Sequence, residues 1–147
     1  MNGAKKHDEK QKGNNKSQTF ANLAEEGNKF FGNLKQELLK FKQSQKIDEL
    51  FTRIEEFVKE YAKDLTTHQL RNIFQEIKKA NDIASLKLIR PNLAYIAGRL
   101  DGNKKNEKTF VAFLDSLIKE VKDDNHLENF KDFMEAIVAY HKFHGKN

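Results

Sequence analysis

The sequence predicts an all-α protein, a compact bundle of about five to six helices with a disordered basic N-terminal tail. Apolar residues recur at spacings of three and four along most of the chain, which is the helical period. Alternating apolar and polar runs bounded by turn residues, the pattern of strands, do not occur. The length of 147 residues, with one proline, fits one compact domain.

The first sixteen residues differ in composition from the rest of the chain. They are rich in Lys, Asn and Gly and have no periodic apolar signal, so burial of apolar surface cannot offset the entropy lost on ordering. Five lysines against Asp8 and Glu9 give them a net charge of +3. We expect residues 1–16 to form a disordered basic tail and residues 17–147 to form a single helical domain.

Two helices are predicted before residue 64. The apolar positions between residues 17 and 45 follow a helical period, which Gly27 and Gly32 weaken. Between residues 47 and 63, apolar residues at spacings of three and four form one stripe, as in an amphipathic helix. We therefore expect a weakly specified helix in the first segment and a regular helix in the second.

The middle of the chain contains three signals for helix boundaries. Thr66 and Gln69 have capping-box spacing, because the Thr66 hydroxyl can accept the Gln69 amide proton while the Gln69 side chain reaches back. That helix is expected to end near Asn81 and Asp82, where the next helix can be capped. Pro91 lacks an amide donor, so the following segment should kink or restart with Pro91 as its first residue.

The last third of the sequence predicts a loop followed by two regular helices. Residues 101–109 read DGNKKNEKT, a composition that favours a loop. Apolar stripes over residues 110–121 and 130–140 predict the helices. Asn125 is the predicted cap of the final helix, and Gly145 lies where a left-handed terminating residue is expected.

Residue types that catalysis or metal binding requires are scarce. The chain has no cysteine, so it has neither a disulfide framework nor a thiolate metal site. The common phosphate-cradling, zinc-protease and nucleophile-elbow motifs do not occur. His141 and His144 could share a helix face and bind zinc weakly, but the favoured interpretation places them in solvent, where they complement the helix dipole. We expect no catalytic residue, no metal and no cofactor.

Hydropathy and composition predict a cytoplasmic protein. The N-terminal residues include no apolar segment of the kind that signal peptides contain. No stretch approaches the roughly 20 apolar residues that span a bilayer. We therefore expect neither secretion nor membrane insertion.

Positive charge is concentrated in one part of the predicted helical domain. The whole chain has a formal net charge of +5, and residues 66–105 contain eight Lys or Arg against three acidic residues. Such a block is usually a solvated face, but it can also bind a polyanion. Arg71 and Lys78 are seven residues apart and share a helix face, with Lys79 beside it. Their stems can lie on the apolar core while their charges point outward.

A second group of cations lies beside small residues. Lys87 and Arg90 align with Ala94 and Gly98 on a helical wheel. A bulky partner can approach such a face, and a phosphate backbone binds Lys and Arg without sequence readout. The alternative is that the small residues only allow tight helix packing.

Three strings, in this order, carry a family resemblance: TTHQLRNIFQEI, LKLIRPNLAYIAGR and ENFKDFMEAIVAYHKFHG. Over residues 66–145 the chain resembles the small helical subunit of the type III-A CRISPR effector complex, the Csm small-subunit family. Asn72 and Asn92 stand where that family often has a basic residue, and Ile89 stands where it has Leu. The resemblance implies a non-catalytic subunit present in several copies, which stack in a minor filament beside the filament that carries the guide RNA. The implied partners are the guide RNA, the target RNA, other subunits and further copies of the chain.

Two hypotheses for function follow. In the leading one, six cations make sequence-independent contacts to the guide or target RNA backbone, namely Arg71, Lys78, Lys79, Lys87, Arg90 and Arg99. In the alternative, the chain is a helix-bundle adaptor without direct RNA binding. Its apolar stripes ending in Phe133, Ile137 and Tyr140 then bind protein partners, and its cations are solvated. Motifs for base-specific recognition are absent from the sequence.

Overall fold

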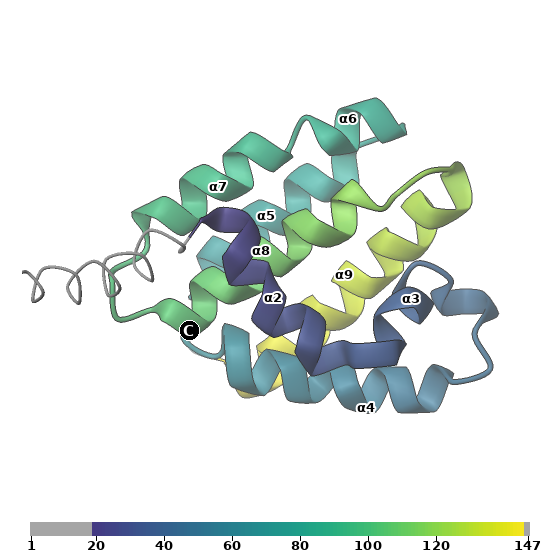
Figure 1. The fold of residues 1–147 in the computed structure, drawn as a ribbon, viewed down its shortest axis with the longest axis horizontal. Helices are drawn as coiled ribbons and strands as arrows, with labels where there is room; N and C mark the ends of the chain where they lie inside the picture. The colour runs from purple at the N-terminus through teal and green to yellow at the C-terminus, as the bar shows by residue number, and fades with distance from the viewer. Residues whose placement is uncertain (1–18, 146–147) are drawn as a thin grey trace, which may run out of the picture.

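The chain folds into helices that share a hydrophobic core in the computed structural model, which describes residues 19–145 (Figure 1). The α-helices are α2 (Phe20–Phe31), α3 (Lys35–Leu38), α4 (Ile47–Phe57), α5 (Thr67–Lys79), α6 (Ile83–Lys87), α7 (Arg90–Arg99), α8 (Lys105–Lys119) and α9 (Asp124–His144). Six of them have ten or more residues, so the predicted all-α bundle is confirmed. The tail predicted for residues 1–16 lies outside the described residues. Within residues 19–145, no helix combines the length and the apolar character that crossing a membrane requires.

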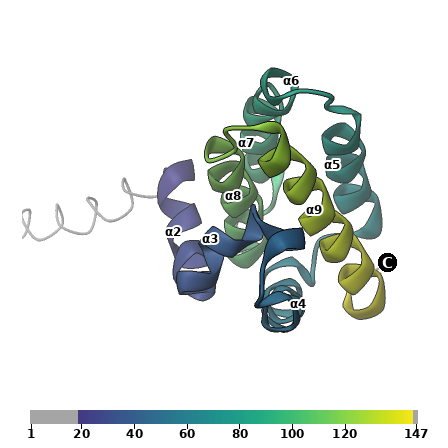
Figure 2. The same cartoon turned by 90° about the vertical axis from the view of Figure 1, so that its right-hand side faces the viewer.

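The central helix of the bundle is α8. Residues 109–115 are all buried, which is expected of a helix that neighbours cover on every side. α2 and α7 pack against α8, and α5 packs against α9 (Figures 1 and 2). Phe31, Phe57 and Phe113 join α2, α4 and α8, with ring centroids 4.9 to 5.1 Å apart. Aromatic packing thus fixes the centre of the core.

The helix predicted between residues 17 and 45 is confirmed only in part. α2 ends at Phe31, because Gly32 has a φ of 53°, in the left-handed region that favours glycine. Two 3₁₀ turns and the short α3 follow. Gly27 does not weaken the helix but serves packing, since a Cβ atom there would lie 2.8 Å from Cδ1 of Phe113. The missing side chain lets α2 approach α8 closely.

The helix predicted between residues 47 and 63 is confirmed, with one irregularity. After α4, the chain continues as a π-helix over Val58–Ala62. The Asn106 side chain, from α8, donates to the carbonyl oxygen of Glu60 at 3.2 Å. This contact ties the π-helix to the start of the central helix.

Helix starts in the middle of the chain agree closely with the prediction. Thr66 Oγ1 accepts from the Gln69 amide at 3.0 Å, and Gln69 Oε1 accepts from the Thr66 amide at 2.8 Å, which confirms the capping box. The Asp82 carboxylate caps α6, as predicted. The restart at the proline is also confirmed, although α7 begins at Arg90 and Pro91 is its second residue.

Three predicted boundaries in the last third of the chain are wrong. The loop expected over residues 101–109 is shorter, because α8 begins at Lys105. The cap of α9 is Asp123 rather than Asn125, since the Asp123 carboxylate accepts a backbone N–H of the first turn at 2.8 Å. Gly145 has φ −88° and ψ −175°, which is extended rather than left-handed backbone.

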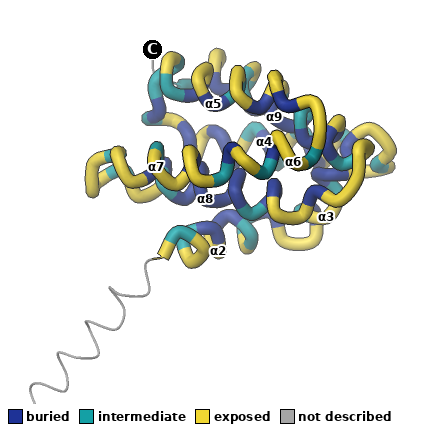
Figure 3. The backbone as a smooth tube through the Cα atoms, turned by 90° about the horizontal axis from the view of Figure 1, so that it is seen from above, coloured by how far each residue is buried: buried dark blue, intermediate teal, exposed yellow. Residues whose placement is uncertain are grey.

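α4 and α7 lie on opposite sides of the bundle. Figure 2 shows α4 at the bottom and α6 and α7 at the top, with α8 and α9 between them. In Figure 3, which looks at the molecule from above, most of the outer surface of α7 is exposed. One side of α7 therefore packs on α8, and the residues of its other side are mostly exposed within the part of the chain that the structure describes.

Candidate nucleic-acid interface

α5 presents three of the predicted cations on its exposed surface. Arg71, Lys78 and Lys79 are all exposed. The side chains of Arg71 and Lys79 make no hydrogen bond or ion pair with any residue from 19 to 145. The Lys78 ammonium lies 5.5 Å from the centroid of the Phe74 ring, a cation–π contact that leaves its charge at the surface. All three charges are therefore available to an external anion.

α9 adds two cations that the sequence-based site did not include. Lys142 lines the same cavity as Arg71, of about 300 Å³. Lys131 Nζ donates to the backbone carbonyl oxygen of Lys78 at 3.2 Å. Arg71 and Lys78 lie seven residues apart on α5, which is about 10 Å along a helix. Together with Lys79, these residues place five cations along the two helices, with the Glu135 carboxylate between Lys131 and Lys142 on α9, and we call this surface the α5–α9 seam.

A partial signal for the missing cations exists in the sequence. Residues 131, 135, 138 and 142 have helical spacing, so Lys131 and Lys142 lie near one side of α9. The spacing does not reveal which helix lies beside that side. The contact of α9 with α5 gives the two lysines their place in the site.

Lys87 and Arg90 have partners within the fold. Lys87 Nζ donates to the carbonyl oxygens of Ile118 at 3.2 Å and Lys119 at 3.0 Å, at the end of α8 where helix carbonyls have no intrahelical donor. Arg90 Nε donates to Asp115 Oδ1 at 2.7 Å, and only 10% of the Asp115 side chain is exposed. Both cations thus hold the α6–α7 segment against α8.

Arg99 belongs to a different surface, on the outer side of α7. Its Nη1 donates to the Tyr95 hydroxyl oxygen at 3.1 Å, and Tyr95 is 61% exposed. Leu88, just before α7, is 77% exposed. Ala94 and Gly98 are exposed as well, and no atom of residues 19–145 lies within 4 Å of a Cβ atom built on Gly98. These five residues form the α7 face. Among residues 19–145, Ala94 and Gly98 therefore do not serve tight helix packing.

The surface predicted for the adaptor alternative is largely core. Phe133 and Ile137 have no exposed area and belong to the hydrophobic core, and Tyr140 is partly buried against it. The prediction that this stripe binds protein partners is therefore wrong for Phe133 and Ile137. Another apolar surface lies nearby, over α9.

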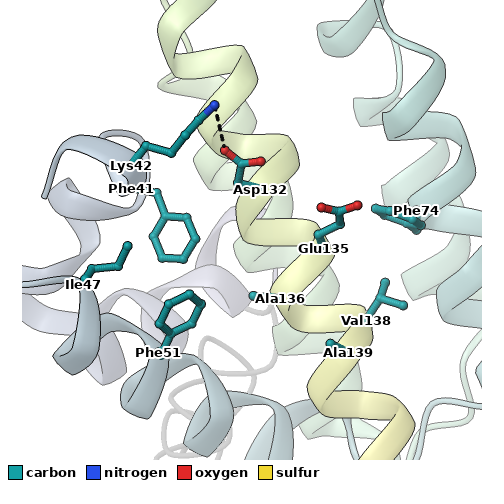
Figure 4. A pocket seen from close by; sticks show the side chains of 10 residues that line it. All are labelled: Phe41, Lys42, Ile47, Phe51, Phe74, Asp132, Glu135, Ala136, Val138 and Ala139. Carbon is teal, nitrogen blue, oxygen red and sulfur yellow. Dashed lines mark ion pairs between the residues drawn. The ribbon is translucent and has the colours of Figure 1, made fainter.

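An apolar groove of about 710 Å³ lies over α9, between α4 and α5 (Figure 4). Its lining is mostly aromatic and aliphatic: Phe41, Lys42, Ile47, Phe51, Phe74, Asp132, Glu135, Ala136, Val138 and Ala139. Lys42 Nζ and Asp132 Oδ2 form an ion pair of 3.4 Å. Glu135 makes no ion pair or side-chain hydrogen bond within residues 19–145. The groove shares Val138 and Ala139 with the cavity of the α5–α9 seam.

His141 and His144 do not lie free in solvent, so that expectation is wrong. His141 is 2% exposed, and its Nε2 lies 2.8 Å from the Leu65 carbonyl oxygen. His144 Nε2 lies 2.7 Å from Glu55 Oε2. In the part of the chain that the structure describes, no group of three His, Cys, Asp or Glu side chains could hold a metal ion. Both histidines fasten the end of α9 to the bundle.

Strong pKa shifts do not mark a catalytic centre among residues 19–145. Burial, followed by its hydrogen bond to Glu26, raises the pKa of Tyr61 to about 12. Burial also raises the pKa of Tyr140. Hydrogen bonds from Ser85 lower the pKa of Asp82, which caps α6. These groups are separate from one another and have structural roles, unlike the paired groups of acid–base sites.

Comparison with known families agrees with the resemblance of the three strings. The family model described as Csm2 Type III-A matches residues 44–147, which is more than half of the chain and includes all three strings. The match also extends N-terminally of Thr66, where the resemblance began. No curated protein and no solved structure gave a match. The chain therefore belongs to the Csm2 Type III-A family, the small subunit of the type III-A CRISPR complex.

Proposed function

We propose that this subunit contacts the backbone of the guide or target RNA through the α5–α9 seam. The observation that carries the proposal is the convergence of Arg71 and Lys142 on one cavity, with Lys79 exposed and unpaired among residues 19–145. Cations that neutralise phosphates release counterions and give affinity without sequence readout. The seam has the free charge that such contacts need, and base-specific motifs are absent from the sequence.

The six cations of the sequence-based hypothesis have different surroundings in the fold, so we propose different roles for them. Arg71, Lys78 and Lys79 keep the RNA-contacting role in our proposal. Lys87 and Arg90 support the surface indirectly, because they fix α6 and α7 on α8. Arg99 belongs to the α7 face.

The proposal also covers the place of the subunit in its complex. Several copies stack in a minor filament in the cytoplasm, and their role is non-catalytic. Membership of a family of structural small subunits supports this role. The unoccupied α7 face and α4–α5 groove give each copy two surfaces at which neighbours can bind.

RNA binding by the assembled complex tests the seam. The double variant Arg71→Gln, Lys79→Gln should weaken binding and lower the slope of log affinity against log salt by about one unit per lost phosphate contact. Arg90→Gln would be a poor probe, because it leaves the Asp115 carboxylate without its partner. Arg71 and Lys79 are exposed and unpaired within residues 19–145, so their loss should leave folding intact.

The matched control removes the same charge elsewhere. Lys59→Gln, Lys63→Gln changes two exposed lysines at the π-helix and just after it, outside the seam. It should leave affinity and salt slope nearly unchanged. Unchanged RNA binding in the Arg71→Gln, Lys79→Gln variant would overturn the site, and equal losses in both variants would assign the effect to net charge alone.

A further inference from the structure

Two apolar surfaces of this chain have no partner within residues 19–145. One is the α7 face, with Leu88 and Tyr95 mostly exposed. The other is the groove between α4 and α5. α7 and α4 lie on opposite sides of the bundle (Figure 2). Contact between two such different surfaces is heterologous, and where its rotation does not close a ring it repeats from copy to copy as an open stack.

The α7 face has projecting side chains and the other surface is a groove, so the two shapes are complementary. Leu88 lies in the turn before α7 and Tyr95 lies within α7, and both side chains are mostly exposed. Ala94 and Gly98 leave room for close approach, since no atom lies within 4 Å of a Cβ atom at Gly98. The groove offers the partly exposed rings of Phe51 and Phe74, on either side of α9, to projecting apolar side chains, whereas the Phe41 ring is buried (Figure 4).

Charge on the two surfaces is also complementary. Arg99 contacts Tyr95 but forms no ion pair within residues 19–145. Glu135 is a carboxylate in the lining of the groove with no partner in the same range. Asp48 and Glu49, in the first turn of α4, add exposed negative charge beside the groove. The cation of the α7 face and the acidic side chains at the groove are therefore complementary in charge.

The N-terminal residues of the chain itself do not match the groove. Residues 1–18 contain only Met1 and Ala4 as apolar residues, against five lysines. Such a segment offers little apolar surface to bury in an aromatic groove. A second copy of the chain provides both the apolar side chains and the cation.

We propose that the α7 face of one copy docks in the α4–α5 groove of the next, with Leu88 and Tyr95 among the groove's rings and Arg99 paired with Glu135. This inference rests on the proposed function, because it names the surfaces through which stacked copies meet. The burial of two large apolar side chains at one contact and the ion pair give the stack its register.

The docking places each copy–copy contact beside the α5–α9 seam. The groove and the seam cavity share Val138 and Ala139, so Arg71 and Lys142 lie next to the docked neighbour. Seams of successive copies therefore follow one another along the stack.

Charge reversal in the reconstituted complex tests the pairing. Arg99→Glu and Glu135→Arg should each reduce the number of copies per complex, as native mass spectrometry measures it, and the two together should restore that number. Lys63→Glu and Glu25→Arg are matched controls, because both residues are exposed and lie outside the two surfaces. They should leave the copy number unchanged.

Cysteine crosslinking gives a second readout, since the native chain has no cysteine. Leu88→Cys and Ala139→Cys change two exposed positions, one on each proposed surface. A mixture of the two single variants should give crosslinked pairs, and the double variant should give a ladder of larger species. Pairs formed by Leu88→Cys alone would show an isologous contact and overturn the docking.

The outcomes separate this inference from the proposed function. If wild-type complexes contain adjacent copies while the reversals and crosslinks have no effect, the docking surfaces are wrong and stacking stands. If the wild-type complex contains a single copy, both stacking and docking are wrong. Loss in the single reversals, rescue in the double reversal and a crosslinked ladder support the docking.

Discussion

The Nε2 atom of His141 lies 2.8 Å from the backbone carbonyl oxygen of Leu65, in a buried position that joins α9 to the chain just before α5. A carbonyl oxygen only accepts hydrogen bonds, so Nε2 carries the proton. His141→Phe preserves an aromatic side chain but leaves the Leu65 carbonyl without its donor. The free energy of unfolding should fall by about 1–3 kcal/mol, which urea denaturation measures.

The control for this change lies two residues further along the same helix. Phe143 is 82% exposed, so Phe143→Ala should change the free energy of unfolding by no more than about 0.5 kcal/mol. Equal stability of the His141→Phe variant and the wild type would show that the hydrogen bond does not fasten α9.

Local signals account for the parts of the fold that the sequence predicted correctly. The capping box of Thr66 and the cap at Asp82 depend on residues three apart, so spacing alone reveals them. The start of α8 at Lys105 was missed because DGNKKNEKT has the composition of a loop. Asn106 contacts the carbonyl oxygen of Glu60, 46 residues away, and no local pattern contains that contact.

In the candidate site, too, local spacing reveals some features, whereas others depend on contacts between residues far apart in the sequence. Arg71 and Lys78 were placed together correctly on the exposed surface of one helix, because they share that helix's period. The contacts of Arg90 with Asp115 and of Lys131 with Lys78 join residues 25 and 53 positions apart. Such contacts depend on how the helices pack, so the sequence could show neither the internal role of Arg90 nor the cations from α9.

Gly27 and Gly98 both lie in helices. Their replacement by alanine should change the free energy of unfolding in opposite directions. At Gly27 the new Cβ would lie 2.8 Å from Phe113 Cδ1, so overpacking should cost about 1–3 kcal/mol of unfolding free energy. That exceeds the gain of up to about 1 kcal/mol from replacing glycine within a helix. At Gly98 the Cβ meets nothing within 4 Å, so only the gain remains. Thermal or urea unfolding of the isolated chain compares the variants, and a stabilised Gly27→Ala variant would contradict the close approach of α2 to α8.

Removing one partner of the Arg90–Asp115 ion pair should lower the free energy of unfolding, and replacing both partners should cost less than the two single changes added together. Arg90→Met leaves the mostly buried Asp115 carboxylate unpaired, so the free energy of unfolding should fall by about 1–3 kcal/mol. In Arg90→Met, Asp115→Leu both charges are gone, and the loss should be smaller than the sum of the two single changes. A double-mutant cycle by urea denaturation measures the coupling. Additive losses would mean that the two side chains do not stabilise one another.

Tyr61 should give the protein a stability contribution that is lost at alkaline pH. Burial, with the hydrogen bond donated to Glu26, raises the Tyr61 pKa from 10.0 to about 12, so folding favours the protonated phenol. That contribution is fully present below the unfolded pKa of 10.0 and is lost as pH rises through about 12. Urea denaturation at increasing pH should show a smaller alkaline loss for Tyr61→Phe than for the wild type. Glu26→Gln should lower the Tyr61 pKa, followed by tyrosinate absorbance, yet leave it above 10.0 because burial remains. Identical alkaline losses in the wild type and Tyr61→Phe would show that the buried phenol does not titrate in this range.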